Sequence, residues 1–275
     1  MEDTNKPLTG QIALVTGGSR GIGKQIAQSF LKEKAKVIIC ARNQPQETIQ
    51  DGESIADYFQ CDVRESTQIM ALIDYCIATY GRLDILVNNA GGAPPADSSS
   101  ASERFTKSII DLNLVAPLIF AQMARKAMID SGGGGLIINI SSISGMRANP
   151  MGVAYGAAKA GLLNATETLA LEWGPEIRVV SVTAGLILTE DSRAFYGDDE
   201  SVSEIEKTIP MRRLGGPEDV ANACLFVASE ASNWISGSNL VIHGGGENPS
   251  YLSCLLYTSP SPRDATLSRM ASCAL

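Results

Sequence analysis

Short apolar runs alternate along the chain with longer stretches in which apolar residues recur every three or four positions. The short runs favour buried strands, because parallel strands covered on both faces are apolar throughout, and the longer stretches favour amphipathic helices. We expect seven strands, at Ile12–Thr16, Val37–Ala41, Ala56–Cys61, Leu83–Asn88, Leu136–Ser141, Ile177–Thr183 and Asn239–Ile242. The helices expected between them are Ile22–Lys34, Ser66–Tyr80, Glu103–Asp130, Val153–Trp173 and Pro217–Ala228. This alternation predicts a single α/β domain with a doubly wound, seven-stranded parallel sheet and helices on both faces.

Two connections interrupt the alternation. Between Arg42 and Ala56 too few residues are apolar for a full amphipathic helix, so we expect a short helix or a loop. The second connection, Thr189–Arg213, is long, polar and acidic, and such connections are commonly lids or binding loops. We call it the lid segment.

The C-terminal stretch differs from the rest of the chain. Residues 254–275 are rich in Ser, Pro and Thr and follow neither a helical nor a strand period. Within them CLLYTSPSPRD resembles one reading frame of a transposase adapter used in DNA library preparation; a disordered natural tail is the alternative. We therefore place the domain at residues 1–253 and treat 254–275 as a non-native tail, in which Cys254 and Cys273 have no function.

Composition and charge narrow the classes of partner. The 275 residues are 44% hydrophobic, enough for a sizeable core, and carry a net charge of −8. Because phosphate binding needs a basic stripe that the chain lacks, we expect a small-molecule substrate and neither nucleic acid nor membrane as a partner. The apolar runs are far shorter than the ~20 residues that span a bilayer, and the polar N-terminus is unlike a secretory signal, so we expect a cytoplasmic protein. The six cysteines lack metal-ligand spacing, which predicts reduced thiols and no metal site.

A glycine-rich turn follows the first expected strand. Gly17, Gly21 and Gly23 lie in the run TGGSRGIG, directly before an expected helix. Glycines allow a tight turn and close approach to a diphosphate, whose charge is stabilised by the free N–H groups of a helix N-terminus. A tight loop without a ligand is the alternative, but the strand–turn–helix context favours a dinucleotide site.

A tyrosine and a lysine share one face of a later helix. Tyr155 and Lys159 are four residues apart, a spacing that places them one helical turn from each other. A neighbouring ammonium favours the phenolate and lowers the phenol pKa from its usual ~10, which would make Tyr155 a usable general acid/base. Such a pair is common by chance and, alone, would more often be ordinary helix surface.

Taken together, TGxxxGxG, the NNAG at 88–91 and this YxxxK resemble the short-chain dehydrogenase/reductase family, in its standard-length 3-oxoacyl reductase-like branch. The resemblance covers roughly residues 8 to 243 and implies a Rossmann fold. It also implies four catalytic residues: Asn113 holds a water, Ser142 orients the substrate oxygen, Tyr155 transfers the proton and Lys159 binds the nicotinamide ribose.

The resemblance implies a nicotinamide cofactor as well. Arg42 stands after the second strand, where a carboxylate would select NAD, and together with Arg20 it could bind a 2′-phosphate. NADP(H) is therefore favoured, with NAD(H) as the alternative. The expected cofactor contacts are Gly17, Ser19, Arg20, Gly21, Ile22, Gly23, Arg42, Asp62, Val63, Asn89, Ala90, Gly91, Tyr155, Lys159, Gly185, Ile187 and Thr189.

The expected reaction interconverts a ketone and a secondary alcohol, with a 3-oxoacyl-CoA or a cyclic, steroid-derived ketone as the candidate substrate. A 3-oxoacyl-[acyl-carrier-protein] reductase and a catalytically silent NADP-binding sensor are the alternatives. The first is weakened by Asp130 and Glu176, which stand where carrier-binding relatives have basic residues. A hydrolase is disfavoured, because the one histidine, His243, lies in a glycine-rich end and no nucleophile elbow is present.

The resemblance further implies a homotetramer or homodimer packed through the helices Glu103–Asp130 and Val153–Trp173. The alternative is that these helix faces are covered within the monomer.

Overall fold

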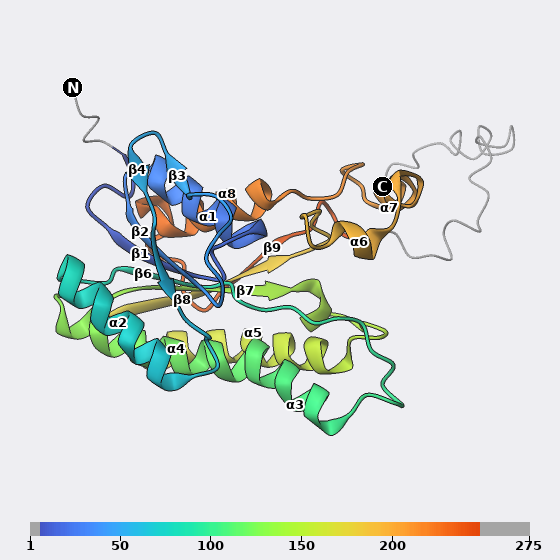
Figure 1. The fold of residues 1–275 in the computed structure, drawn as a ribbon, viewed down its shortest axis with the longest axis horizontal. Helices are drawn as coiled ribbons and strands as arrows, with labels where there is room; N and C mark the ends of the chain where they lie inside the picture. The colour runs from blue at the N-terminus through green and yellow to red at the C-terminus, as the bar shows by residue number, and fades with distance from the viewer. Residues whose placement is uncertain (1–5, 248–275) are drawn as a thin grey trace, which may run out of the picture.

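A seven-stranded parallel sheet between two layers of helices forms the centre of the computed structural model, which describes residues 6–247 (Figure 1). The strands lie in the order β5-β2-β1-β6-β7-β8-β9. Their bounds are β1 Ile12–Thr16, β2 Lys36–Ala41, β5 Asp57–Gln60, β6 Ile85–Asn88, β7 Gly135–Ser142, β8 Ile177–Ala184 and β9 Asn239–Ile242. The order reverses between β1 and β6, and sheets of this type bind ligands at that point, beyond the carboxyl ends of the strands. The predicted doubly wound fold is confirmed.

Two helical layers cover the two faces of this sheet. α1 and α8 lie over one face, and α2, α4 and α5 lie over the other (Figure 1). Their bounds are α1 Gly21–Lys32, α2 Ser66–Tyr80, α4 Ala116–Asp130, α5 Val153–Trp173 and α8 Pro217–Ala228. Along β1, Ala13 and Val15 join the first core, whereas Ile12 and Leu14 join the second. Because both of their faces are buried, inner strands such as β1 and β6 are continuous apolar runs.

The helix predicted at Glu103–Asp130 consists of three consecutive parts. α3 (Glu103–Ile110) and α4 are joined by a π-helical turn, η1 (Asp111–Val115). This run is also long and apolar enough to cross a bilayer, with 39% of its most apolar window buried. That is weak evidence for a membrane span, since the core helix of a soluble protein passes the same test, and α4 packs Phe120 and Ala124 into the second core.

The connection after β2 differs from the prediction of a short helix or loop. Residues 42–56 contain an antiparallel hairpin formed by β3 (Gln50–Asp51) and β4 (Ser54–Ile55). Three of the four strand residues are exposed. With nothing to bury, the hairpin leaves no apolar pattern in the sequence.

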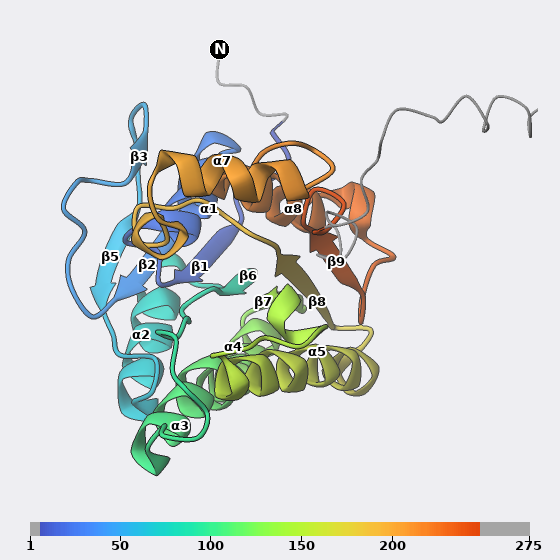
Figure 2. The same cartoon turned by 90° about the vertical axis from the view of Figure 1, so that its right-hand side faces the viewer.

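The lid segment folds into two helices, α6 (Arg193–Tyr196) and α7 (Asp199–Thr208). Both lie at the end of the molecule toward which β7 runs, beyond the carboxyl edge of the sheet (Figures 1 and 2). Val202 and Ile209 of the segment form a small apolar core with Leu214, which directly follows it. The predicted interruption of the strand–helix alternation is thus present, and its role as a lid stays a prediction.

The cysteines of the domain are thiols, as predicted. Those that are free and buried are Cys40, Cys61, Cys76 and Cys224. The predictions for residues 254–275, with Cys254 and Cys273, lie outside the described residues.

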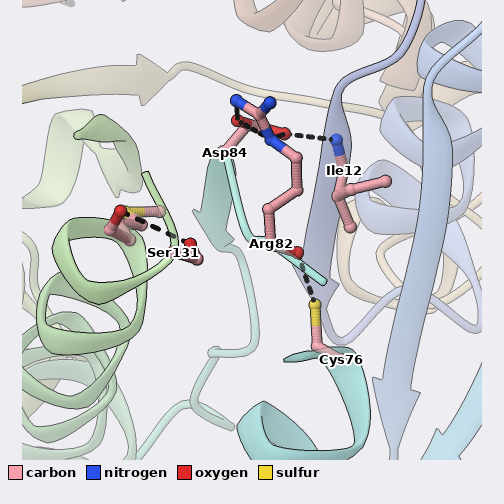
Figure 3. Close-up of polar contacts among 6 residues, drawn as sticks. Ile12, Cys76, Arg82, Asp84 and Ser131 are labelled. Carbon is pink, nitrogen blue, oxygen red and sulfur yellow. Dashed lines mark hydrogen bonds and ion pairs between the residues drawn. The ribbon is translucent and has the colours of Figure 1, made fainter. Parts of the chain in front are cut away.

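At the amino edge of the sheet, Asp84 joins three strands (Figure 3). Its carboxylate accepts the N–H of Ile12 at 2.8 Å and two bonds from Nε of Arg82, and its carbonyl accepts the N–H of Leu136 at 2.8 Å. These bonds fix the starts of β1, β6 and β7 against one another. The long lid segment lies at the opposite, carboxyl edge of the sheet.

Near the carboxyl edge, a buried polar ladder connects the sheet to α5. Nδ2 of Asn88 donates to Oδ1 of Asn139 at 3.0 Å, and Nδ2 of Asn139 donates to Oγ1 of Thr166 at 2.9 Å. Each of the three side chains is at most 5% exposed. The ladder holds β6, β7 and α5 in one register, since slippage would leave buried amides without partners.

We expect Thr166→Val to lower the free energy of unfolding by about 1–3 kcal/mol, because it leaves the Asn139 amide without its acceptor. Thr168→Val is the matched control: Thr168 is on the same helix but exposed, and its loss should change the free energy by no more than about 0.5 kcal/mol. Denaturant unfolding of both variants measures the difference. Equal effects would contradict a stabilising role for the ladder.

Candidate active site

The glycine turn lies at the carboxyl end of β1. Gly17 and Gly21 have φ of +64° and +53°, in the left-handed region that favours glycine. The N–H of Gly17 donates to the carbonyl of Cys40 at 2.8 Å, which ties the turn to β2. A Cβ at Gly23 would overlap the Gly17 carbonyl and the Asn89 side-chain amide. The turn therefore requires glycine at these positions, as the sequence suggested.

The N-terminus of α1 suits an anion. Arg20 is the N-cap residue of α1, but its side chain does not cap the helix. The first backbone N–H groups of α1 therefore have no side-chain acceptor. Ser19 and Ile22 are partly exposed on the turn. Opposite, a Cβ placed on Gly21 would come 3.7 Å from Cγ2 of Thr189 in the lid segment. An uncapped helix N-terminus beside a glycine-rich backbone fits the diphosphate of a dinucleotide.

The residues after β6 are hydrogen-bonded to the same turn. Nδ2 of Asn89 donates to the carbonyls of Thr16 at 2.9 Å and Gly17 at 3.2 Å, and the N–H of Ala90 donates to Oγ1 of Thr16 at 2.9 Å. This arrangement explains the NNAG sequence, because Asn89 stabilises the carbonyls of the turn.

Arg42 and Asp62 lie at the other end of this region. Both line a surface cavity of about 590 Å³. Asp62 is paired with Arg64, whose hydrogen bonds hold the pKa of the Asp62 carboxyl below its usual value, with a smaller contribution from Arg42. Val63 is buried behind them. Arg42 is exposed and takes part in no ion pair within residues 6–247, so its guanidinium is available to an anion.

Lys159 is buried where α5 passes the end of β7. Its Nζ donates to the Ile140 carbonyl at 2.8 Å and lies 5.8 Å from the centre of the Tyr155 ring, so the two side chains share a face as predicted. Oγ of Ser141 donates to the Lys159 carbonyl at 3.3 Å. A Cβ at Gly145 would stand 2.7 Å from the Lys159 carbonyl carbon, so only glycine lets the turn after β7 pack on α5.

Ser142 ends β7 and faces Tyr155. Its Oγ accepts the N–H of Ser144 at 3.2 Å, which fixes the side chain at the start of a short helix, η2 (Ile143–Gly145). The Ser142 side chain lies close enough to the Tyr155 phenol to lower the phenol pKa, so the two predicted oxygen-binding groups are neighbours. Two further residues contribute to the site: Ile140 through its carbonyl and Gly145 through its packing on α5. Motif spacing does not predict them, because a backbone carbonyl and a packing contact leave no signal in the spacing of side chains.

Asn113 lies in the π-helical turn and is fully buried. Its Oδ1 accepts the N–H of Gly92 at 2.8 Å, and its Nδ2 donates to the carbonyls of Gly92 and Ile109, both at 3.0 Å. A Cβ at Gly91 would lie 2.7 Å from this Oδ1 and 3.3 Å from Nζ of Lys159. Asn113 therefore holds the 91–92 backbone beside the lysine. π-helical turns occur frequently at functional sites.

Burial dominates the electrostatics of the tyrosine–lysine pair. Desolvation lowers the pKa of Lys159 to about 8. Desolvation also raises the pKa of Tyr155, and the neighbouring Ser142 side chain opposes the rise only in part. The expected lowering of the phenol pKa by the lysine is therefore absent in the protein alone. The Lys159 ammonium donates to the Ile140 carbonyl and lies 5.8 Å from the centre of the Tyr155 ring, and the causes of the Tyr155 pKa shift are burial and Ser142.

The remaining predicted residues follow β8. The N–H of Gly185 donates to the Ile242 carbonyl at 2.8 Å, and Ile187 forms an isolated parallel bridge with Gly215. Thr189 closes a turn with Ser192, whose Oγ accepts the Thr189 N–H at 2.7 Å. These contacts fix the start of the lid segment, and Thr189 lies beside Gly21 of the glycine turn.

Across residues 6–247, no group of three or more His, Cys, Asp or Glu side chains is arranged to hold a metal ion. The site thus consists of a dinucleotide cradle, a phenol, a hydroxyl and a buried amine.

Such a site in a doubly wound sheet defines an NAD(P)-dependent oxidoreductase. Residues 16–247 match the family model described as enoyl-(acyl carrier protein) reductase. The chain is 35% identical to glucose 1-dehydrogenase 2 of Bacillus subtilis, over 87% of this chain and 96% of the relative, and 34% identical to the 7α-hydroxysteroid dehydrogenase of Escherichia coli, over 88% and 96%.

Solved structures agree with these relatives. The ligand-free aldohexose dehydrogenase of Thermoplasma acidophilum superposes with a TM-score of 0.82 at 32% identity, covering 87% of this chain and 95% of that one. A short-chain dehydrogenase/reductase of Mycobacterium marinum gives 0.83 at 32% identity, covering 90% and 99%. The chain belongs to the short-chain dehydrogenase/reductase family.

We expect the buried Lys159 to make stability depend on pH. Its pKa falls from 10.5 to about 8 on folding, so the folded protein binds fewer protons than the unfolded chain between these values, and the free energy of unfolding rises with pH there. The free energy of unfolding of the wild type, minus that of Lys159→Met, should increase by about 3 kcal/mol between pH 7 and pH 10.5. Denaturant unfolding across this range measures it; the tyrosine and cysteine titrations common to both proteins cancel. A constant difference would contradict the lowered pKa.

Proposed function

We propose that the protein catalyses the NADP(H)-dependent interconversion of a ketone and a secondary alcohol, with Tyr155 as the general acid/base. The observation that carries the proposal is the meeting of Ser142, Tyr155 and Lys159 at the carboxyl edge of the sheet, beside the uncapped N-terminus of α1. A coincidental tyrosine–lysine spacing would not bring a serine hydroxyl and a dinucleotide cradle to the same place.

The cofactor, when bound, supplies the hydride in reduction and accepts it in oxidation. The hydroxyls of Ser142 and Tyr155 hold the substrate oxygen and stabilise its developing negative charge. Because burial raises the pKa of Tyr155, the phenol is protonated at neutral pH and can donate its proton to that oxygen. Lys159 binds the nicotinamide ribose and helps restore the proton, while Asn113 fixes the adjacent 91–92 backbone.

The proposed preference for NADP(H) rests on charge. A basic residue, Arg42, follows β2, where a carboxylate would bind the ribose hydroxyls of NAD, and Arg20 lies on the glycine turn. Both guanidinium groups can form charge-assisted bonds with a 2′-phosphate. NAD(H) is the alternative cofactor.

We propose as substrate either a 3-oxoacyl-CoA or a cyclic, steroid-derived ketone. The name of the Escherichia coli relative, a hydroxysteroid dehydrogenase, supports the second. Met146 and Met151, in the connection between Ser142 and Tyr155, are 53% and 50% exposed and offer apolar surface near the reacting groups. The matched family model favours a carrier-protein substrate as the alternative.

The functional unit is proposed to be a cytoplasmic homotetramer or homodimer. Val115 of η1, Val153 and Leu171 of α5 are 38%, 64% and 88% exposed, so these helices keep apolar side chains uncovered within one chain. A cavity of about 720 Å³ along α3 and α4 is lined by both acidic and basic side chains, a mixture that suits self-association.

We expect Tyr155→Phe to retain NADPH binding and to lower kcat by about a hundred- to ten-thousandfold, since it removes the proton-transfer group. NADPH oxidation in the presence of a panel of 3-oxoacyl-CoA and cyclic ketones measures turnover, and fluorescence titration measures binding. Tyr75→Phe, which removes a phenol hydroxyl from α2, is the control and should stay active. An active Tyr155→Phe protein would refute the proposed role; a wild type that binds NADPH but turns over no ketone would support the silent sensor instead.

Arg42→Asp should weaken NADPH binding by about ten- to a hundredfold and NADH binding far less, because it replaces a phosphate-binding cation by an anion. Lys36→Asp makes a similar charge change at the other end of β2, far from the site, and should leave the ratio of the two dissociation constants unchanged. Equal losses for NADPH and NADH in Arg42→Asp would overturn the preference for NADP(H).

A further inference from the structure

One ion pair joins the lid segment to the glycine turn. Nε of Arg20 lies 3.0 Å from Oδ2 of Asp191, and the two side chains are 66% and 57% exposed. Arg20 immediately precedes α1, and Asp191 lies two residues after Thr189. The guanidinium that could meet a 2′-phosphate is thus already held by a carboxylate of the protein.

The carboxylate is carried by a well-fixed turn. The Thr189 N–H donates to Oγ of Ser192 at 2.7 Å, and the Ser192 N–H donates to Oγ1 of Thr189 at 3.1 Å. The backbone between them, which bears Asp191, is closed into a small loop beside Gly21. Asp191 therefore stands at the border of the dinucleotide cradle rather than on a free surface.

The pair is weak enough to be exchanged. Water screens two charges that are both more than half exposed, so their attraction contributes little. A ribose 2′-phosphate carries up to two negative charges and three acceptor oxygens, and would therefore compete well for the same guanidinium. NAD(H) has a neutral hydroxyl at this position, so it gains nothing from displacing Asp191.

We propose that Asp191 is a positioning residue that sets the cofactor preference through Arg20. Its carboxylate holds the guanidinium in the free protein and opposes a 2′-phosphate when NADP(H) binds. Asp191 thereby reduces the difference in binding affinity between NADP(H) and NAD(H). This inference rests on the proposed function, because it requires a dinucleotide in the glycine cradle.

The test is equilibrium binding of NADPH and NADH, followed by fluorescence, to wild type, Asp191→Asn, Arg20→Gln and the double variant. Asp191→Asn should tighten NADPH binding about two- to fivefold and leave NADH binding unchanged. In the Arg20→Gln background the same substitution should have a clearly smaller effect. Asp199→Asn is the matched control: it removes one charge from the same segment, but its partner is Arg193, and it should change neither dissociation constant.

Three results would overturn the inference: an NADPH affinity unchanged by Asp191→Asn, an equal gain from Asp199→Asn, or an undiminished gain in the Arg20→Gln background. Each of these results leaves the proposed function intact, provided that the wild-type protein binds NADPH or NADH. A wild-type protein that binds neither dinucleotide would overturn both the inference about Asp191 and the proposed function. Binding to the wild type therefore distinguishes the failure of the inference from the failure of the proposed function.

Discussion

The hydrogen bond from the Lys159 ammonium to the Ile140 carbonyl joins the two elements on which the site depends. Ile140 lies two residues before Ser142 on β7, and Lys159 lies one turn after Tyr155 on α5. The bond and the close packing at Gly145 fix the end of the strand against the helix. Ser142 and Tyr155 are therefore brought together by backbone geometry, and in the proposed reaction both hydroxyls are oriented before a carbonyl substrate binds.

This arrangement has an energetic cost that the protein accommodates. Burying an ammonium without a carboxylate partner is unfavourable, and the lowered pKa of Lys159 measures that cost. The same dry surroundings keep the Tyr155 phenol protonated, which suits reduction. The polar ladder of Asn88, Asn139 and Thr166 lies between the same elements, β6, β7 and α5, and stabilises them against this local strain on the fold. Destabilised active sites supported by well-bonded surroundings are common in enzymes.

The sequence was sufficient for the sheet, because its inner strands β1, β6, β7 and β8 are largely buried and leave apolar runs. It was insufficient for the exposed hairpin β3–β4, although the Asp51-Gly52 pair is a known hairpin signal that the apolar pattern alone does not weigh. Motif spacing predicted that Ser142, Tyr155 and Lys159 belong to one site, and the structure places them near one another. It could not show the π-helical turn around Asn113, which depends on backbone hydrogen bonds, nor the direction of the Tyr155 pKa, which depends on burial. The contact between Arg20 and Asp191 joins residues that are far apart in the sequence and forms only when the lid segment is folded. A local sequence pattern therefore cannot predict it.

The lid segment has a small core of its own, separate from the two cores of the sheet. Substitutions within α6 and α7 therefore have little effect on the packing that keeps the strands together. The surface beyond the carboxyl edge of the sheet can therefore change while the strands stay in place. A scaffold divided in this way tolerates substitutions in its lid segment without losing its fold.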